Sequence, residues 1–136
     1  MDIPFARKVL EFVEIEHDDT VHRQKTFYWS PAMEESWRFR YRLPSYYDQG
    51  CKTAACICGT AVMLSPNAEI AVEYTSAVVM FDGRMSCWTV AGKQLLGITD
   101  DQAQVLFYEM DDKKAIGILR DYIEQAEAEE VAGNEV

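Results

Sequence analysis

Four cysteines and two histidines are the residues of this chain whose chemistry suits a metal site. They are Cys51, Cys56, Cys58, Cys87, His17 and His22. Structural zinc sites favour cysteines separated by two to four residues on turns, where both sulfurs approach one ion. Cys56 and Cys58 are two apart on a predicted helix, so their side chains should point about 200° apart. A site that combines Cys51, Cys56 and Cys87 with a histidine is conceivable, but buried thiols used as packing are the favoured interpretation, and we expect no metal or cofactor.

Cys51 has the sequence surroundings that best suit a reactive thiol. It directly precedes a predicted helix and is followed by Lys52, and positive potential favours the nucleophilic thiolate. No pattern around it matches a known nucleophile signature. The segment 50–53 also lacks the glycine spacing of a phosphate-binding loop. We therefore expect no catalytic residues, and keep a thiol- or zinc-dependent enzyme centred on Cys51 and Cys56 as the alternative.

The chain has one basic cluster, where arginines alternate with aromatic residues. Its sequence is Trp37-Arg38-Phe39-Arg40-Tyr41-Arg42-Leu43. Alternation predicts a strand with the aromatic residues inward and the arginines outward, although Glu34 and Arg38 have the spacing of a helical ion pair. An outward arginine face suits phosphates, single-stranded nucleic acid or an acidic protein patch. Pairing with the chain's own carboxylates is favoured, but Trp37, Arg38, Arg40 and Arg42 are the candidate binding residues.

The element that should hold these groups in place is an almost wholly apolar segment, Ala54–Leu64. A helix that is apolar on every side is buried on every side. We predict a central helix over about 53–64, ended by Pro66. A second helix is predicted over 3–16, capped by Asp2, with one apolar side to pack against the centre.

Strand patterns follow the central helix. Residues 69–74 and 77–81 are strand candidates, and Asp82-Gly83 predicts a tight hairpin with the segment 84–88. Residues 26–29 are a further possible strand. The predicted sheet is small and antiparallel, with a hairpin near 77–90.

The last third of the chain has helical patterns. A short helix is expected over 91–96, ended by Gly97, and Thr99 to Gln102 has the pattern of a capping box. A final helix begins after Asp112, and the acidic residues 128–136 are expected to fray. The fold class is therefore α+β, mainly helical, with one domain over 1–127.

Composition and charge narrow the function classes. The chain has 136 residues, of which 49% are hydrophobic, and a formal net charge of −10. Residues 1–50 contribute −2 (seven Lys/Arg, nine Asp/Glu) and residues 51–136 contribute −8 (six and fourteen). This balance argues against broad nucleic-acid binding, which depends on attraction to phosphates. No apolar run approaches the ~18 residues of a membrane span, and we expect a cytoplasmic location with no membrane partner.

Cys51-x4-Cys56-Ile57-x-Gly59-x-Ala61 and the segment from Leu95 to Phe107 are two distinctive motifs of this chain. Both resemble segments of small uncharacterised proteins of actinobacteria and their phages, and the first is similar to C-x4-C-I-A-G-x-A in that group. The second begins at Leu95 and is similar to L-L-G-L-T-x-x-Q-A-x-x-L-F. Cys58 stands where the group has alanine, and the run 37–42 has no counterpart there.

The resemblance implies a phage or mobile-element origin and supplies no catalytic residues. Small proteins of this kind commonly bind a host protein. We therefore expect a non-enzymatic interaction protein that binds a host component, with self-association into a homo-oligomer also open. A nucleic-acid binder that uses Arg38, Arg40 and Arg42 is the second alternative.

Overall fold

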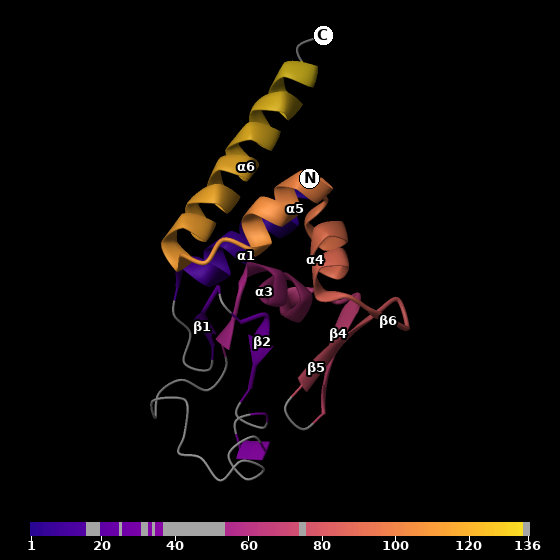
Figure 1. Cartoon of the computed structure of the whole chain (residues 1–136). Coiled ribbons are helices and arrows are strands. Elements are labelled where there is room, and N and C mark those ends of the chain that lie inside the picture. Colours follow the sequence, from indigo (N-terminus) through magenta and orange to yellow (C-terminus); the bar gives the residue numbers. More distant parts are fainter. Residues whose placement is uncertain are drawn as a thin grey trace.

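Helix α3 (Ile57–Leu64) lies at the centre of the computed structural model, with helices above it and strands below (Figure 1). The structure describes residues 1–15, 20–24, 26–30, 33, 35–36, 54–73 and 76–134. Within these residues five helices accompany two three-stranded sheets. The predicted fold class, α+β and mainly helical, is confirmed. No helix in the described residues is both long and apolar enough to cross a membrane.

Helix α1 (Ile3–Glu14) has the predicted cap and the predicted inward face. The Asp2 side chain accepts a hydrogen bond from the Phe5 N–H at 3.2 Å, and Pro4 lies in the first turn, where its missing N–H costs little. The buried residues of this helix lie on one side, facing α3; they are Ala6, Val9, Leu10 and Val13.

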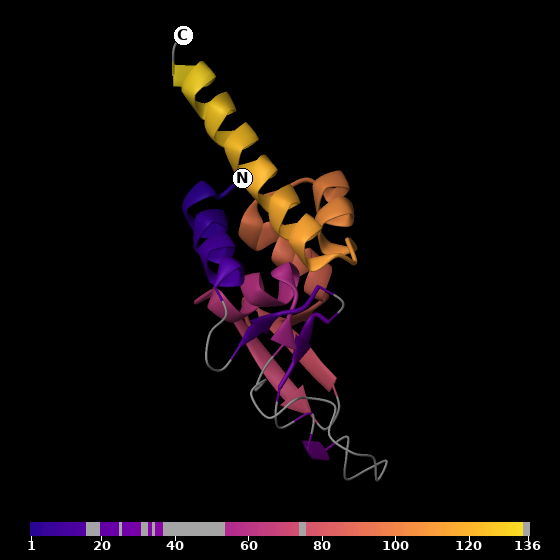
Figure 2. The ribbon, with the colours of Figure 1, turned by 90° about the vertical axis from the view of Figure 1, so that its left-hand side faces the viewer.

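Helix α6 (Asp112–Asn134) packs antiparallel to α1 and then extends beyond it (Figure 2). Arg120 Nη2 lies 2.5 Å from Glu14 Oε1, and Arg7 pairs with Glu127 towards the opposite end of α1. Helix α6 continues through residues 128–134, most of the acidic segment in which fraying is expected from the sequence. Residues 128–133 are exposed, so this end of the helix projects from the rest of the described structure (Figure 2).

The remaining helices are α4 (Trp88–Leu96) and α5 (Asp100–Phe107). The predicted capping box at the start of α5 is confirmed: Thr99 Oγ1 accepts from the Gln102 N–H, and Gln102 Oε1 accepts from the Thr99 N–H. Gly97 ends α4 with a φ of 67°, a left-handed conformation that glycine adopts without strain.

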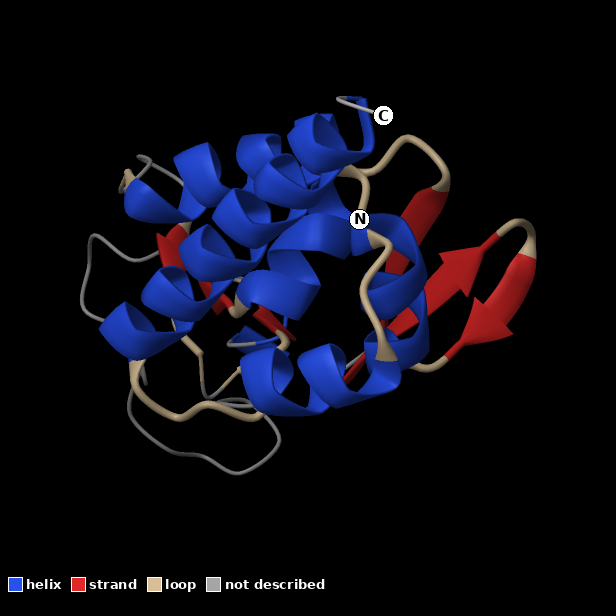
Figure 3. Cartoon of the chain, turned by 90° about the horizontal axis from the view of Figure 1, so that it is seen from above, coloured by secondary structure: helices blue, strands red, loops and turns tan. Residues whose placement is uncertain are grey.

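One sheet is the predicted antiparallel hairpin with a third strand. Its strands lie in the order β4 (Ala68–Glu73), β5 (Ser76–Phe81) and β6 (Arg84–Ser86). The turn between β5 and β6 uses Asp82 and Gly83, both at positive φ, as their sequence predicts. Figure 3 shows this sheet to one side of the helices.

The predicted end of this hairpin near residue 90 is wrong. Strand β6 ends at Ser86, Cys87 is the N-cap of α4, and Trp88 is helical. The Trp88 indole N–H donates to the Ala77 carbonyl oxygen at 3.2 Å. Because β6 ends at Ser86, opposite Val79, no β6 residue lies opposite Ala77, and the indole bonds to the Ala77 carbonyl there instead.

The second sheet is mixed and was not predicted as a whole. Its strands are two residues each, in the order β1 (Val21–His22), β3 (Ala54–Ala55) and β2 (Tyr28–Trp29). The pairing of β3 is parallel with β1 and antiparallel with β2. The possible strand over residues 26–29 is therefore confirmed at Tyr28 and Trp29.

This sheet corrects the predicted start of the central helix. Ala54 and Ala55 are strand residues whose backbone is held by β1 and β2, so the helix begins at Ile57 rather than near residue 53. Cys56 is the N-cap, and its Sγ accepts a hydrogen bond from the Gly59 N–H at 3.4 Å. The prediction that α3 is buried on all sides is confirmed for Ile57–Val62.

A buried glutamine connects the start of α3 to the helices above it. Gln24 Oε1 accepts from the Ile57 N–H at 3.2 Å and from His22 Nε2 at 3.1 Å. Its Nε2 donates to the Leu106 carbonyl oxygen, and its backbone N–H donates to Asp112 Oδ1, both at 2.6 Å. One side chain therefore ties together three segments that are distant in sequence.

Candidate interaction surface on the outer side of α4

The outer side of α4 carries apolar residues that the fold does not bury. Its inner side packs on α3 through Ala91 and Leu96, which are fully buried. Val90 lies on the opposite side of the helix and is 43% exposed. The helix is held in place by Trp88, whose ring stacks with Phe27 and Tyr28 at centroid distances of 6.1 and 6.3 Å.

Two hollows flank this side of α4. The first lies between α4 and α5 and has a volume of about 260 Å³; it is lined by Thr89, Val90, Lys93, Asp100, Ala103, Gln104 and Tyr108. The second lies between α4 and the β5–β6 hairpin and has a volume of about 540 Å³; it is lined by Phe81, Asp82, Arg84, Met85, Ser86, Val90 and Gln94. Val90 lines both hollows, which therefore adjoin at this residue.

Three large apolar side chains stand out from this surface. Met85 on β6 is 73% exposed, and Tyr108 at the end of α5 is 54% exposed, with Val90 between them. Isolated exposed apolar residues are common, but side chains gathered around adjoining hollows are typical of binding sites. Methionine adapts its shape to a partner, and tyrosine and methionine are enriched at protein interfaces. We call Met85, Val90 and Tyr108 the α4 surface.

The charges on this surface are nearly balanced. Lys93 Nζ lies 2.6 Å from Asp100 Oδ1, so the lysine at the first hollow already has a carboxylate partner. The second hollow has Asp82 and Arg84 on its wall, both exposed. An apolar centre with a mixed polar rim is the usual arrangement of a protein–protein interface.

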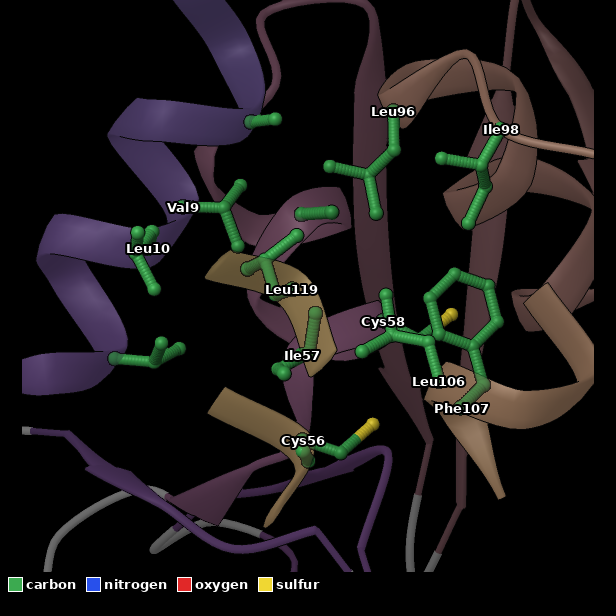
Figure 4. Close-up of a cluster of buried hydrophobic side chains, with 14 of the residues drawn as sticks. Val9, Leu10, Cys56, Ile57, Cys58, Leu96, Ile98, Leu106, Phe107 and Leu119 are labelled. Carbon is green, nitrogen blue, oxygen red and sulfur yellow. The ribbon is translucent and has the colours of Figure 1, made fainter. Parts of the chain in front are cut away.

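The thiols of Cys56 and Cys58 lie inside the protein. Figure 4 shows both side chains among the buried core residues around α3. Burial raises the pKa of Cys56 to about 11, and burial followed by the neighbouring Cys56 raises the pKa of Cys58 well above its ordinary value. The Cys58 thiol donates to the Trp88 carbonyl oxygen at 3.0 Å. Both groups are therefore neutral thiols near pH 7, and serve as small apolar side chains and caps.

The other candidate residues are not brought together. Cys87 is exposed at the N-cap of α4 and makes no side-chain capping bond. His22 is half-buried beside Gln24. Within the described ranges, no three His, Cys, Asp or Glu side chains converge in a way that suits a metal ion.

Several predicted site residues lie outside the described part of the chain. They are the candidate binding residues Trp37, Arg38, Arg40 and Arg42, together with Cys51 and His17. The basic face and the Cys51 thiol thus remain predictions from sequence.

The α4 surface itself was missed by sequence reasoning. The sequence held one signal. Ala91 and Leu96 mark the inward face of this helix, and Val90 is an apolar residue on the opposite, solvent-facing side. The two hollows, however, depend on where α5 and the hairpin lie beside α4, which no local pattern specifies.

Comparison with protein-family models, with curated proteins and with solved structures gave no match to this chain.

Proposed function

We propose that this protein is a non-enzymatic interaction protein that binds a partner protein through the α4 surface. The observation that carries the proposal is the meeting of two hollows at Val90, with Met85 and Tyr108 exposed on either side. Burial of these three side chains against a partner would be favourable, since each fully buried side chain of this size contributes roughly 1.5–3 kcal/mol.

The partner that we propose is a host protein of an actinobacterium. Support for this comes from the resemblance of the segments 51–61 and 95–107 to proteins of actinobacteria and their phages. It also agrees with the net charge of −10, which disfavours a nucleic acid as partner.

The state of Cys56 does not favour the thiol-enzyme alternative. Catalytic thiols have a lowered pKa and are accessible, whereas Cys56 is 1% exposed and its pKa is about 11. An enzyme of this class would therefore have to act without Cys56 as its nucleophile.

Affinity capture from an actinobacterial lysate followed by mass spectrometry tests the proposal. The wild-type protein is compared with the double variant Met85→Ser/Val90→Ser, which leaves the core unchanged. We expect a specific host protein with the wild type and at least a tenfold weaker recovery with the double variant, since residues at the centre of an interface contribute most of its affinity.

Val131→Ser is the matched control, because Val131 is 58% exposed but lies on the projecting end of α6. Its recovery of the partner should equal that of the wild type. Retention of the same partner by the double variant, or equal loss with Val131→Ser, would contradict the proposal.

A further inference from the structure

Strand β4 has a free edge in the described part of the chain. The sheet order places β5 on one side of β4 and no described strand on the other. The Asp82 N–H donates to the Asn67 carbonyl oxygen at 3.4 Å. This bond shows which residues of β4 direct their backbone groups towards β5. Because bonded pairs alternate along antiparallel strands, Asn67, Glu69 and Ala71 bond towards β5. The backbone groups of Ala68, Ile70 and Val72 therefore point away from the sheet.

The position of Trp88 independently supports this assignment of the inward and outward backbone groups. Ala77 lies opposite Val72. By the same alternation this is a non-hydrogen-bonded pair, whose backbone groups point away from each other. The Ala77 carbonyl should then face the β6 side, and there it accepts the bond from the Trp88 indole. The equivalent groups of Val72 on the β4 side have no hydrogen bond to a described residue.

The two edges of this sheet are protected differently. Strand β6 has three residues, one of which is Arg84. Strand β4 has six residues and contains no lysine, arginine or proline, and its apolar residues range in exposure from 8% at Ala68 to 36% at Val72. Short strands, basic residues and proline are the usual means by which proteins prevent pairing at an edge, so β4 is the open one.

We propose that β4 pairs antiparallel with β4 of a second copy of this chain, centred on Ile70. In this register Ile70 lies opposite Ile70 of the partner subunit, and Ala68 lies opposite the partner's Val72. Each of these directly opposite pairs exchanges both of its N–H···O bonds. The outward backbone groups of Ala68, Ile70 and Val72 are then satisfied in both copies, and the same three residues form the matching set on each side of the axis at Ile70.

The side chains fit the same register. Ile70 and Val72 lie on the face that packs towards α3 and α4, with Val79 and Phe81, so pairing continues an apolar face across the axis. On the other face, the exposed Glu69 lies opposite the partner's Ala71, which avoids a directly opposed pair of like charges. The two Glu69 residues remain diagonal neighbours, so the dimer should be stronger at higher salt.

Sedimentation equilibrium over a range of protein concentrations, with reductant so that Cys87 cannot link copies, tests the pairing. We expect a reversible monomer–dimer equilibrium. Val72→Pro removes an outward N–H in both copies while it keeps the bonds to β5, and should weaken the dimer at least tenfold. Glu69→Gln is the matched control and should strengthen it, because it removes a like-charge pair at the same edge.

Hydrogen exchange of the unaltered protein gives a test that does not depend on a variant's folding. Amides of Ala68, Ile70 and Val72 should become more protected as concentration rises, while those of Glu69 and Ala71 are protected throughout. A monomer at all concentrations, or concentration-independent exchange at these three amides, would overturn the proposal. So would a monomer that binds an extended peptide of another protein at this edge. Since the α4 surface includes Met85 on β6, at the opposite edge of the sheet from β4, Val72→Pro should still capture the host partner.

Discussion

The two sides of the α3–α4 pair use apolar residues in opposite ways. The enclosed residues are small. Gly92 lies against Cys58 where the two helices meet, and Gly59 lies against the Phe27 carbonyl on another side of α3. On the outer side of α4 the apolar residues are large and open, and no described element covers Met85, Val90 or Tyr108.

This difference separates residues that specify the fold from residues available for binding. At the enclosed side, substitution changes the distance between backbones and should be costly. At the open side, substitution removes little packing and should leave stability nearly unchanged. Size and exposure together, rather than hydrophobicity, distinguish the two roles.

Gly59→Ala should break the enclosed side most severely. A Cβ at position 59 would lie 1.6 Å from the Phe27 carbonyl oxygen, so the backbone of one segment must move. We expect a loss of more than about 3 kcal/mol in the free energy of unfolding, measured by chemical denaturation.

Gly117→Ala is the control for that substitution. It is also a helical glycine, but a Cβ there would meet nothing within 4 Å. Replacement by alanine should stabilise α6 by up to about 1 kcal/mol. Equal effects at positions 59 and 117 would show that close approach is not what requires Gly59.

Gly92→Ala tests how closely α3 and α4 must approach each other. The new Cβ would lie 2.6 Å from Cys58 Sγ, which should cost about 1–3 kcal/mol of unfolding free energy. Cys58→Ala removes that sulfur. The double variant should therefore be more stable than the sum of the two single effects, with a coupling of about 0.5–3 kcal/mol in a double-mutant cycle. Strict additivity would contradict this contact.

Acid should weaken the segment that joins β1 to α3. Burial lowers the pKa of His22, opposed by its hydrogen bond to Gln24 and by Asp112, while Arg23 lowers it further. The unfolded chain then binds a proton more readily than the folded protein, so stability is complete above the ordinary value of 6.5 and falls as the pH drops below it. Thermal unfolding between pH 8 and pH 5 should show this decline, and His22→Gln should flatten it. An unchanged slope in the variant would assign the decline to other groups.

Val90→Ser should have the smallest effect on stability of these substitutions. Val90 is 43% exposed, and its replacement removes no core contact. The free energy of unfolding should change by no more than about 0.5 kcal/mol in denaturant titration. A loss similar to that of Gly92→Ala would place Val90 among the residues that maintain the fold.

Local signals in the sequence predicted much of this fold correctly. The cap at Asp2, the capping box at Thr99 and the Asp82-Gly83 turn each depend on residues a few positions apart, and the structure has all of them. Their physical causes are short-range hydrogen bonds and backbone preferences, which a short stretch of sequence contains.

The predictions that were wrong depended on distant partners. Ala54 and Ala55 have a helical composition, but pairing with residues 21–22 and 28–29 makes them a strand. Trp88 follows a strand pattern in the sequence, but it is the first residue of α4, and its indole bonds to the distant Ala77 carbonyl. The hollows beside Val90 likewise depend on the relative positions of three elements, so the candidate site was beyond prediction from sequence.

A photo-crosslinking side chain placed at position 90 gives the most direct test of the open side. The protein with this substitution is irradiated in an actinobacterial lysate, alongside the same side chain at position 131. The α4 surface predicts one discrete crosslinked species from position 90 and none from position 131. The same crosslinked products from both positions, or no product from position 90, would contradict the proposed surface.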